Sequence, residues 1–209
     1  MLNKPEISNF YKEKLKEYGA SAEGMGWRDK ESQFVRFKQL IEVIDSSGSF
    51  SINDIGCGTG ELITLLKDKF IGKFSYLGYD GLEDMITLAK KQFPESKAIK
   101  FKKIKDYEQI EQCDYSVASG IFNVKNNIDE KEWQQYILAT ITTMSLYSLK
   151  GFAFNALTSY CDADKKKSEL HYSDPLFLFD YCKKKFSKNV SLLHDYNLYD
   201  FTILVKKEL

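Results

Sequence analysis

The chain has 209 residues, 43% of them hydrophobic, which suffices for one globular domain with a sizeable core. Thirty basic side chains (Lys+Arg 30) balance thirty acidic ones (Asp+Glu 30), which excludes nucleic-acid binding through an overall basic surface. The 4 cysteines lack metal-type spacing and no apolar run is long enough to cross a bilayer, so we expect a cytoplasmic monomer or homodimer with no metal, nucleic-acid or membrane partner.

Two amphipathic helices are predicted before the first strand. Apolar side chains recur at helical spacing over residues 5–18 and again over residues 30–45. A loop of small residues, 19–28, lies between these two helices and ends in Trp27 and Arg28. Asp29 follows it and is a suitable cap for the second helix.

A glycine-rich turn joins the first predicted strand to the next helix. Residues 51–62 read Ser-Ile-Asn-Asp-Ile-Gly-Cys-Gly-Thr-Gly-Glu-Leu, with glycines at alternate positions 56, 58 and 60. Glycine adopts turn dihedrals closed to other residues, and its lack of a side chain lets a ligand approach the backbone. The helix that begins after the turn points free N–H groups toward this ligand.

A second strand, predicted over residues 75–80, ends in an acid. Asp80 lies 24 residues after Gly56. In a strand–helix–strand unit, this distance places a carboxylate at the tip of the neighbouring strand, where it can accept both hydroxyls of a ribose.

The remaining elements continue the same alternation of strands and helices. Helices are expected over 60–69, 83–93, 130–147 and 175–185. Strands are expected over 98–104, 114–123, 151–157, 190–194 and 199–205. The connection 158–173 is long for a compact domain, and such loops are often functional.

Together, the acid–Gly–Gly–Gly pattern led by Asp54 and the stretch from Asp80 to Met85 resemble the class I S-adenosylmethionine-dependent methyltransferases. A dinucleotide fingerprint would have its third glycine where Glu61 stands. The glycine pattern thus departs from that of NAD(P)-binding proteins at Glu61, and an NAD(P)-dependent Rossmann oxidoreductase is kept as the alternative, with a non-catalytic cofactor-binding protein as another.

The resemblance covers roughly residues 30–205 and implies an α/β, Rossmann-like three-layer sandwich. Its sheet is expected to be mostly parallel and seven-stranded, with a C-terminal antiparallel hairpin. The N-terminal helices are expected to form a lid over residues 1–46, and residues 47–209 are expected to complete one domain of 1–209.

The resemblance also implies the cofactor, S-adenosyl-L-methionine, and the residues that bind it. The loop, the ribose acid and the segment after it supply Asp54, Gly56, Cys57, Gly58, Gly60, Asp80, Gly81 and Met85. The adenine is expected at Asp106 and Tyr107, and the sulfonium at Ser119 and Gly120. From the lid we expect Tyr11, Trp27 and Arg36, although ordinary packing or surface ion pairs remain open for the first and the last.

The acceptor is expected beyond the carboxyl ends of the strands, where the 158–173 loop and the last hairpin turn meet. His194 and His171 are the candidate general bases, since a histidine pKa lies near neutrality; a structural role is the alternative for both. The candidate substrate residues are Arg28, Phe122, Asn123, Tyr160, Tyr172, Asp195 and Tyr196.

The predicted reaction is O-methylation of a small molecule. The chain lacks the Asn/Asp-Pro-Pro-Tyr/Phe signature of some amino-methyltransferases after its fourth strand, which argues against methylation of DNA adenine or glutamine. The chain also resembles little-characterised bacterial methyltransferases, which implies a metabolite or a cell-surface polysaccharide precursor as the acceptor.

Overall fold

A computed structural model describes residues 5–19, 21, 24 and 29–208. Its centre is a seven-stranded sheet in the order β3-β2-β1-β4-β5-β7-β6. Its strands are β1 (Phe50–Ile55), β2 (Phe74–Asp80), β3 (Ile99–Lys103), β4 (Cys113–Ala118), β5 (Ser148–Leu157), β6 (Asn189–Leu193) and β7 (Asp200–Lys206). Strands β1 to β5 pair in parallel, while β7 runs antiparallel to both of its neighbours, β5 and β6.

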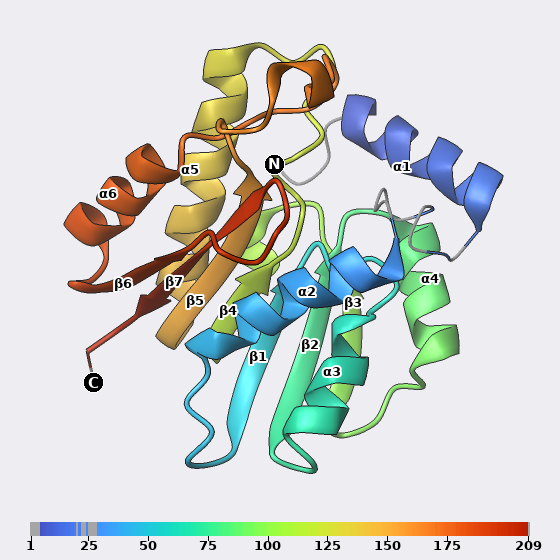
Figure 1. Ribbon diagram of the computed structural model, residues 1–209. Coiled ribbons are helices and arrows are strands. Elements are labelled where there is room, and N and C mark those ends of the chain that lie inside the picture. The colour runs from blue at the N-terminus through green and yellow to red at the C-terminus, as the bar shows by residue number, and fades with distance from the viewer. Residues whose placement is uncertain (1–4, 20, 22–23, 25–28, 209) are drawn as a thin grey trace.

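Helices cover both faces of this sheet (Figure 1). The described α-helices are α1 (Pro5–Tyr18), α2 (Lys30–Leu40), α3 (Leu62–Lys69), α4 (Glu83–Gln92), α5 (Glu130–Tyr147) and α6 (Pro175–Lys185). Short 3₁₀ turns among the described residues are η2 (Ile41–Val43), η3 (Tyr107–Gln109) and η4 (Ala163–Lys165). Helices α2, α3 and α4 lie on one face and α5 and α6 on the other, which gives three layers.

Local sequence explains where the long helices begin. Asp29 caps α2 by accepting the Ser32 N–H at 2.7 Å, as the sequence predicts. Asp129 and Asp174 cap α5 and α6 in the same way, and Pro175 occupies the first turn of α6, where no N–H is needed.

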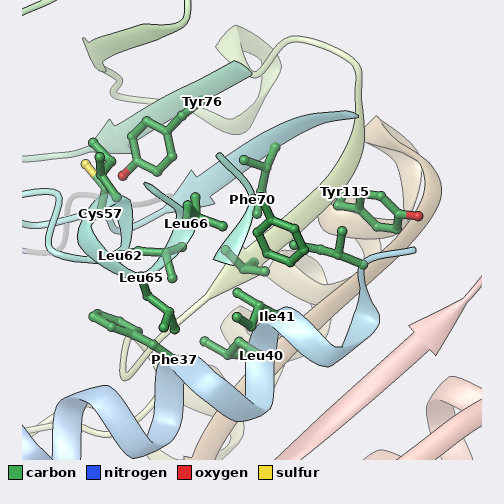
Figure 2. Close-up of a cluster of buried hydrophobic side chains, with 14 of the residues drawn as sticks. Phe37, Leu40, Ile41, Cys57, Leu62, Leu65, Leu66, Phe70, Tyr76 and Tyr115 are labelled. Atoms are coloured by element: carbon green, nitrogen blue, oxygen red, sulfur yellow. The ribbon is translucent and has the colours of Figure 1, made fainter. Parts of the chain in front are cut away.

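The cluster beneath α2 and α3 fixes these helices on the sheet (Figure 2). Phe37, Leu40 and Ile41 of α2 and η2 pack with the leucines of α3, and Leu40 is wholly buried. The second cluster lies under α5 and α6. It includes Trp133 and Phe122, whose side chains are almost completely buried. Apolar burial on both faces supplies most of the stabilisation of such a sheet.

The predicted fold class is confirmed: the sheet is seven-stranded, mostly parallel, and closed by an antiparallel hairpin. The fourth strand is shorter than predicted and ends at Ala118, because Gly120 turns the backbone away with φ +72°. The fifth strand begins earlier, at Ser148, directly after the last residue of α5.

The two N-terminal helices have different surroundings. Helix α1 has no fully buried residue, and its Tyr11 and Leu15 pack against Leu82 and Met85 at the carboxyl end of the sheet. Helix α2 instead belongs to the layer that packs on the sheet, through Phe37 and Leu40. The division between a lid (1–46) and a core (47–209) stays a prediction.

The described residues contain neither a membrane-spanning helix nor a metal-binding cluster. No helix in the part of the chain that the structure describes has the length and apolarity to cross a membrane. Among the same residues, no group of three or more His, Cys, Asp or Glu side chains is placed to hold a metal ion.

Candidate active site

The glycine-rich turn after β1 takes a backbone path that side chains would block. Gly56 has φ +74°, and a Cβ added there would lie 2.3 Å from Cγ2 of Ile121. The N–H groups of Gly56 and Cys57 both donate to the carbonyl oxygen of Tyr79, at 2.8 and 2.9 Å, which ties the turn to the end of β2. The turn is therefore held against β2 and the segment after β4.

The third glycine of the turn serves packing. Gly60 has φ +81°, and a Cβ there would lie 2.9 Å from the ring of Phe101 and 3.3 Å from Phe93. These rings belong to β3 and to the end of α4, so Gly60 allows α3 to begin close to the sheet.

Asp80 ends β2 with its carboxylate turned toward this turn. One oxygen accepts the Gly58 N–H at 3.0 Å, and the other accepts the Leu82 N–H at 2.9 Å. Burial raises the pKa of the Asp80 carboxyl, and the backbone N–H groups of Leu82, Gly58 and Gly81 oppose that rise. The carboxylate lies where the sequence predicts a ribose-binding acid.

A second carboxyl near the pocket, that of Asp54 on β1, is buried. Its Oδ2 accepts the hydroxyl of Tyr76 at 2.8 Å. Burial raises the pKa of Asp54 to about 7; the Tyr76 hydrogen bond opposes that rise and the nearby charge of Asp80 adds to it. A positively charged ligand group would find two carboxylates here.

A pocket opens between the turn, the carboxyl ends of the central strands and α1. Its empty volume is about 880 Å³, which includes the open mouth of the pocket. The lining residues are Ile7, Ser8, Tyr11, Gln33, Phe37, Asp54, Gly56, Cys57, Gly58, Thr59, Glu61, Asp80, Gly81, Leu82, Met85, Ser119, Ile121 and Tyr136.

One part of the pocket wall is apolar and aromatic. It comes from Ile7 and Tyr11 of α1, Phe37 of α2, Ile121 after β4, and Tyr136 of α5. Burial raises the pKa of both phenols, and Asp80 adds to this effect at Tyr11, so both hydroxyls stay neutral at physiological pH.

One amide interrupts this wall. Gln33 lies one helical turn before Phe37, is only 5% exposed, and lines the pocket. No hydrogen bond of its side chain to another described residue is found, so its amide is available to solvent or to a bound molecule.

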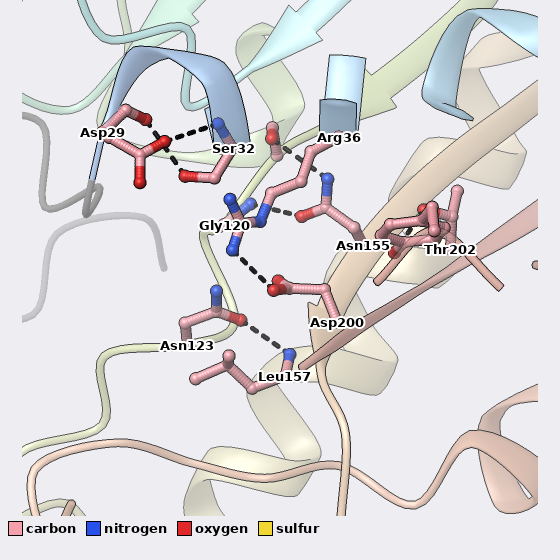
Figure 3. Close-up of polar contacts among 11 residues, drawn as sticks. Asp29, Ser32, Arg36, Gly120, Asn123, Asn155, Leu157, Asp200 and Thr202 are labelled. Carbon is pink, nitrogen blue, oxygen red and sulfur yellow. Dashed lines mark hydrogen bonds and ion pairs between the residues drawn. The ribbon is translucent and has the colours of Figure 1, made fainter. Parts of the chain in front are cut away.

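Asn155 fixes the segment after β4 (Figure 3). Its side chain, from β5, accepts the Gly120 N–H at 2.8 Å and donates to the Ser119 hydroxyl at 3.1 Å. Asn155 is completely buried. Its hydrogen bonds from β5 therefore fix the position of Ser119, which lines the pocket.

Comparison with known proteins decides the family. A family model described as a methyltransferase domain matches residues 52–142. The chain is 43% identical over 167 residues to the putative methyltransferase Rv1506c of Mycobacterium tuberculosis, a match that covers 80% of this chain and 99% of that protein. The chain belongs to the class I S-adenosylmethionine-dependent methyltransferases.

Solved methyltransferases share the fold at low sequence identity. The N-methyltransferase NodS of Bradyrhizobium japonicum, bound to S-adenosylhomocysteine, is 14% identical with a TM-score of 0.64, covering 98% of this chain and 100% of NodS. Human N-acetylserotonin methyltransferase, in complex with S-adenosylmethionine, is 13% identical with a TM-score of 0.67, covering 99% of this chain and 60% of that one. The cofactor of this methyltransferase is S-adenosylmethionine.

The structure brings many of the predicted cofactor residues of the methyltransferase to one pocket. The lining includes Asp54, Gly56, Cys57, Gly58, Asp80, Gly81, Met85, Ser119 and Tyr11. Gly60 and Gly120 are not among the lining residues, since Gly60 packs on aromatic rings and Gly120 is bonded to Asn155. Trp27 and Arg28 lie outside the described residues.

The predicted adenine residues lie outside the pocket lining. Asp106 is exposed at the start of η3, where its N–H donates to the side chain of Gln109 at 3.4 Å. Tyr107 is half-buried and its hydroxyl bonds to Thr140 of α5. The β3 exit forms a self-contained 3₁₀ turn, which turns Asp106 to solvent.

Arg36 does not line the pocket, contrary to the prediction of a cofactor contact. Its Nη2 lies 2.6 Å from Oδ2 of Asp200, with side-chain exposures of 11% and 1% (Figure 3). This pair joins α2 to the start of β7. Arginine at this position therefore fixes the helix that presents Gln33 and Phe37 to the pocket.

Two predicted substrate residues after β4 are structural. Phe122 is completely buried under α5, so it cannot face a reacting methyl group. Asn123 accepts the Leu157 N–H at 3.1 Å with its side chain and the His171 N–H at 2.8 Å with its carbonyl. Both residues lie behind the pocket wall.

The two histidines also lie away from the pocket lining. His171 is buried, with Nδ1 at 2.7 Å from Glu130 at the start of α5. Burial lowers the pKa of His171, and Glu130 opposes the change. His194 is exposed at the end of β6, with its ring near Tyr160 and Phe201.

The other predicted substrate residues lie around these histidines. Tyr160 is 64% exposed, the Tyr172 hydroxyl accepts the Lys167 N–H at 3.0 Å, and Asp195 is exposed. The Tyr196 hydroxyl shares a hydrogen bond with Thr202 at 3.0 Å. None of these four residues is in the pocket lining.

Sequence reasoning missed several lining residues, above all Gln33, Phe37, Ile121 and Tyr136. Gln33 carried one signal: a polar residue on the face of the helix that also presents Phe37 and Ile41. The other three are apolar residues within apolar stripes, where pattern alone does not separate a pocket wall from a core.

Proposed function

We propose that the pocket binds S-adenosylmethionine with its ribose on Asp80 and its methionyl part between Gly56, Asp54 and Ser119. The arrangement of donors and acceptors supports this: a half-buried carboxylate at the strand tip, a close backbone turn, and an apolar shelf of Leu82 and Met85 for the adenine. When bound, the cofactor supplies an electrophilic methyl group on a positively charged sulfur.

This proposal predicts pH-dependent binding through Asp54. The free pocket holds the Asp54 carboxyl with a pKa of about 7, well above its unfolded value near 4. Its proton is therefore bound more tightly in the folded apoprotein, and the stability that this gives is lost as the pH rises through 7. The ammonium group of the ligand's amino acid part favours the ionised carboxylate, so affinity for S-adenosylhomocysteine should increase by roughly tenfold between pH 6 and pH 8.

Isothermal titration calorimetry across that range measures this effect. The Asp54→Asn variant should lose most of the pH dependence while keeping the shape of the side chain. An unchanged slope in this variant would assign the titration to another group.

We further propose that the methyl acceptor is an oxygen atom of a small, ring-bearing metabolite. The observation that carries this is the aromatic part of the pocket lining, Tyr11, Phe37 and Tyr136, together with the amide of Gln33. Among the described lining residues there is no lysine, arginine or histidine, which disfavours a phosphate, a carboxylate or nucleic acid.

The acceptor hydroxyl is proposed to be phenolic or enolic. Neither candidate histidine lines the pocket, and the phenols of Tyr11 and Tyr136 remain protonated. A hydroxyl that is already acidic needs little help from a base, whereas a sugar hydroxyl would need one. A phenol or enol therefore suits the wall better than a polysaccharide precursor does.

The solved relatives do not indicate which atom of the acceptor is methylated. Their names include an N-methyltransferase and a carbon methyltransferase as well as a magnesium protoporphyrin IX methyltransferase. Our choice of oxygen depends on the side chains of this pocket alone.

His194 is expected to contribute little to the reaction. Replacing it with asparagine should leave kcat within about threefold of the parent, because a general base typically contributes 100-fold or more. Steady-state kinetics at pH 7.5 measures this. A loss above 100-fold would restore the histidine as a base.

A panel assay tests the acceptor. The enzyme is incubated with S-adenosylmethionine and separate sets of phenols, enols, sugars, carboxylic acids and amines, and S-adenosylhomocysteine and the methylated product are identified by mass spectrometry. We expect turnover with phenols or enols and an ether product. Turnover confined to amines or sugars would contradict the proposal.

Three further predictions stand beside this one. We propose a cytoplasmic bacterial enzyme, one domain over residues 1–209 with residues 1–46 as a lid, and no membrane or nucleic-acid partner. The place of Tyr11 and Ile7 in the pocket wall supports the role of α1.

A further inference from the structure

The two edges of the sheet differ in charge. At one edge, β3 carries Lys100, Lys102 and Lys103, all exposed. Charged side chains on an edge strand prevent pairing with another chain. At the other edge, β6 reads Asn-Val-Ser-Leu-Leu and carries no charged residue. Figure 1 shows β6 as the outermost strand, with its free side uncovered.

The helix above this edge also exposes apolar surface. Helix α6 packs over β6, where Val190 and Leu192 contact the same buried cluster as Leu178. At the start of α6, Leu176 and Phe177 are 57% and 41% exposed. A chain that paired with the free edge would bring its own covering layer beside α6.

We propose that two copies of this chain associate through β6, antiparallel, into a dimer with one continuous sheet. A two-fold axis perpendicular to the sheet relates two such strands and keeps equivalent faces on the same side. A pairing centred on Ser191 places Val190 opposite Leu192 of the second copy, so that apolar side chains meet on the face covered by α6.

The charges that flank β6 suit this pairing. Lys188 precedes the strand and Asp195 follows it, both exposed. Neither forms an ion pair with another described residue. An antiparallel arrangement brings the start of one strand beside the end of the other, so the two charges approach each other twice. At β3 the same arrangement would place lysines against lysines.

The size of this surface indicates moderate affinity. One strand and part of one helix bury less area than obligate dimers do, which places the pair among weaker interfaces. We expect dissociation in the micromolar range. The dimer inference is independent of the proposed acceptor, since β6 contributes no residue to the described pocket lining.

Light scattering after size-exclusion chromatography tests the dimer with the full chain. The monomer has a mass of 24.2 kDa, and we expect twice this mass for the parent protein at about 100 µM. Ser191→Lys should give the monomer, because it places two like charges across the axis. Ser49→Lys is the matched control, since Ser49 is exposed before β1, away from this edge.

Cross-linking gives a second measurement. Residues opposite each other across antiparallel strands have Cα atoms about 4.5–5.5 Å apart, which a disulfide can span. Ser191→Cys should therefore form a disulfide-linked dimer on mild oxidation, while Ser49→Cys should not. The described native cysteines, Cys57, Cys113, Cys161 and Cys182, are free and buried.

Two results would contradict the proposed dimer. A monomeric parent at about 100 µM would overturn the proposal. So would a dimer that persists in Ser191→Lys and leaves Ser191→Cys unlinked, because the contact would then lie elsewhere. Thermal melting with S-adenosylhomocysteine verifies that each variant is folded.

Discussion

Replacing Asp80 with alanine is expected to weaken the binding of S-adenosylhomocysteine by more than about 100-fold. The carboxylate is the proposed acceptor for the ribose hydroxyls, and hydrogen bonds to a charged group contribute about 1.5–3 kcal/mol each. Its loss also leaves the Gly58 and Leu82 N–H groups without the acceptor that orients the turn. Isothermal titration calorimetry on the purified variant measures the change.

Two further variants define what this result means. Glu83→Ala removes an exposed carboxylate three residues away, one that pairs with Lys103 at 3.5 Å, and should leave affinity unchanged. Asp80→Asn keeps the shape of the side chain but loses its charge, and should also bind poorly. If both Asp80 variants bind within threefold of the parent, the ribose lies elsewhere.

Replacing Arg36 with methionine is expected to lower the free energy of unfolding by about 3–5 kcal/mol. Asp200 is 1% exposed, and removal of Arg36 leaves a buried charge without this partner. For a chain of this length, the loss corresponds to a fall in Tm of roughly 6–20 °C. Differential scanning calorimetry measures it.

The same variant separates two roles for Arg36. If the residue fixes α2 on β7, affinity for S-adenosylhomocysteine measured well below Tm should change by less than about threefold. Lys38→Met, on the exposed side of the same helix, should change neither quantity. A tenfold weaker affinity with an unchanged Tm would instead support the contact with the cofactor that the sequence predicts.

Elements were predictable where local signals agree. The helix over 5–18 and the helix over 130–147 have the bounds that apolar spacing predicts, and Asp29 caps α2 as expected. The turn at Gly56 and the acid at Asp80 were identifiable because their spacing follows from one strand–helix–strand unit. The parallel order of the central strands follows from the same unit and its handedness.

Roles that depend on side-chain direction were not predictable. Arg36 and Asp200 are 164 residues apart and meet only after α2 packs against the C-terminal hairpin. Phe122 follows directly on residues at the site, but Gly120 turns the chain so that its ring enters the core. His171 lies on a long loop that was expected to be functional, and it instead binds Glu130.

The aromatic part of the pocket lining illustrates the same limit. Tyr136 lies in an apolar stripe of α5, and its neighbours Trp133 and Ile137 are core residues. Periodicity gives the inward face of a helix, but a pocket exists only where the facing elements leave space between them.

The central claim is that the turn at Gly56 and the carboxylate of Asp80 hold the methyl donor. A crystal structure with S-adenosylhomocysteine tests it most directly. We expect both ribose hydroxyls within hydrogen-bond distance of the Asp80 carboxylate, with the sulfur beside Gly56 and Ser119. A ligand whose sugar lies away from Asp80, or an empty turn with the ligand bound elsewhere, would contradict the account.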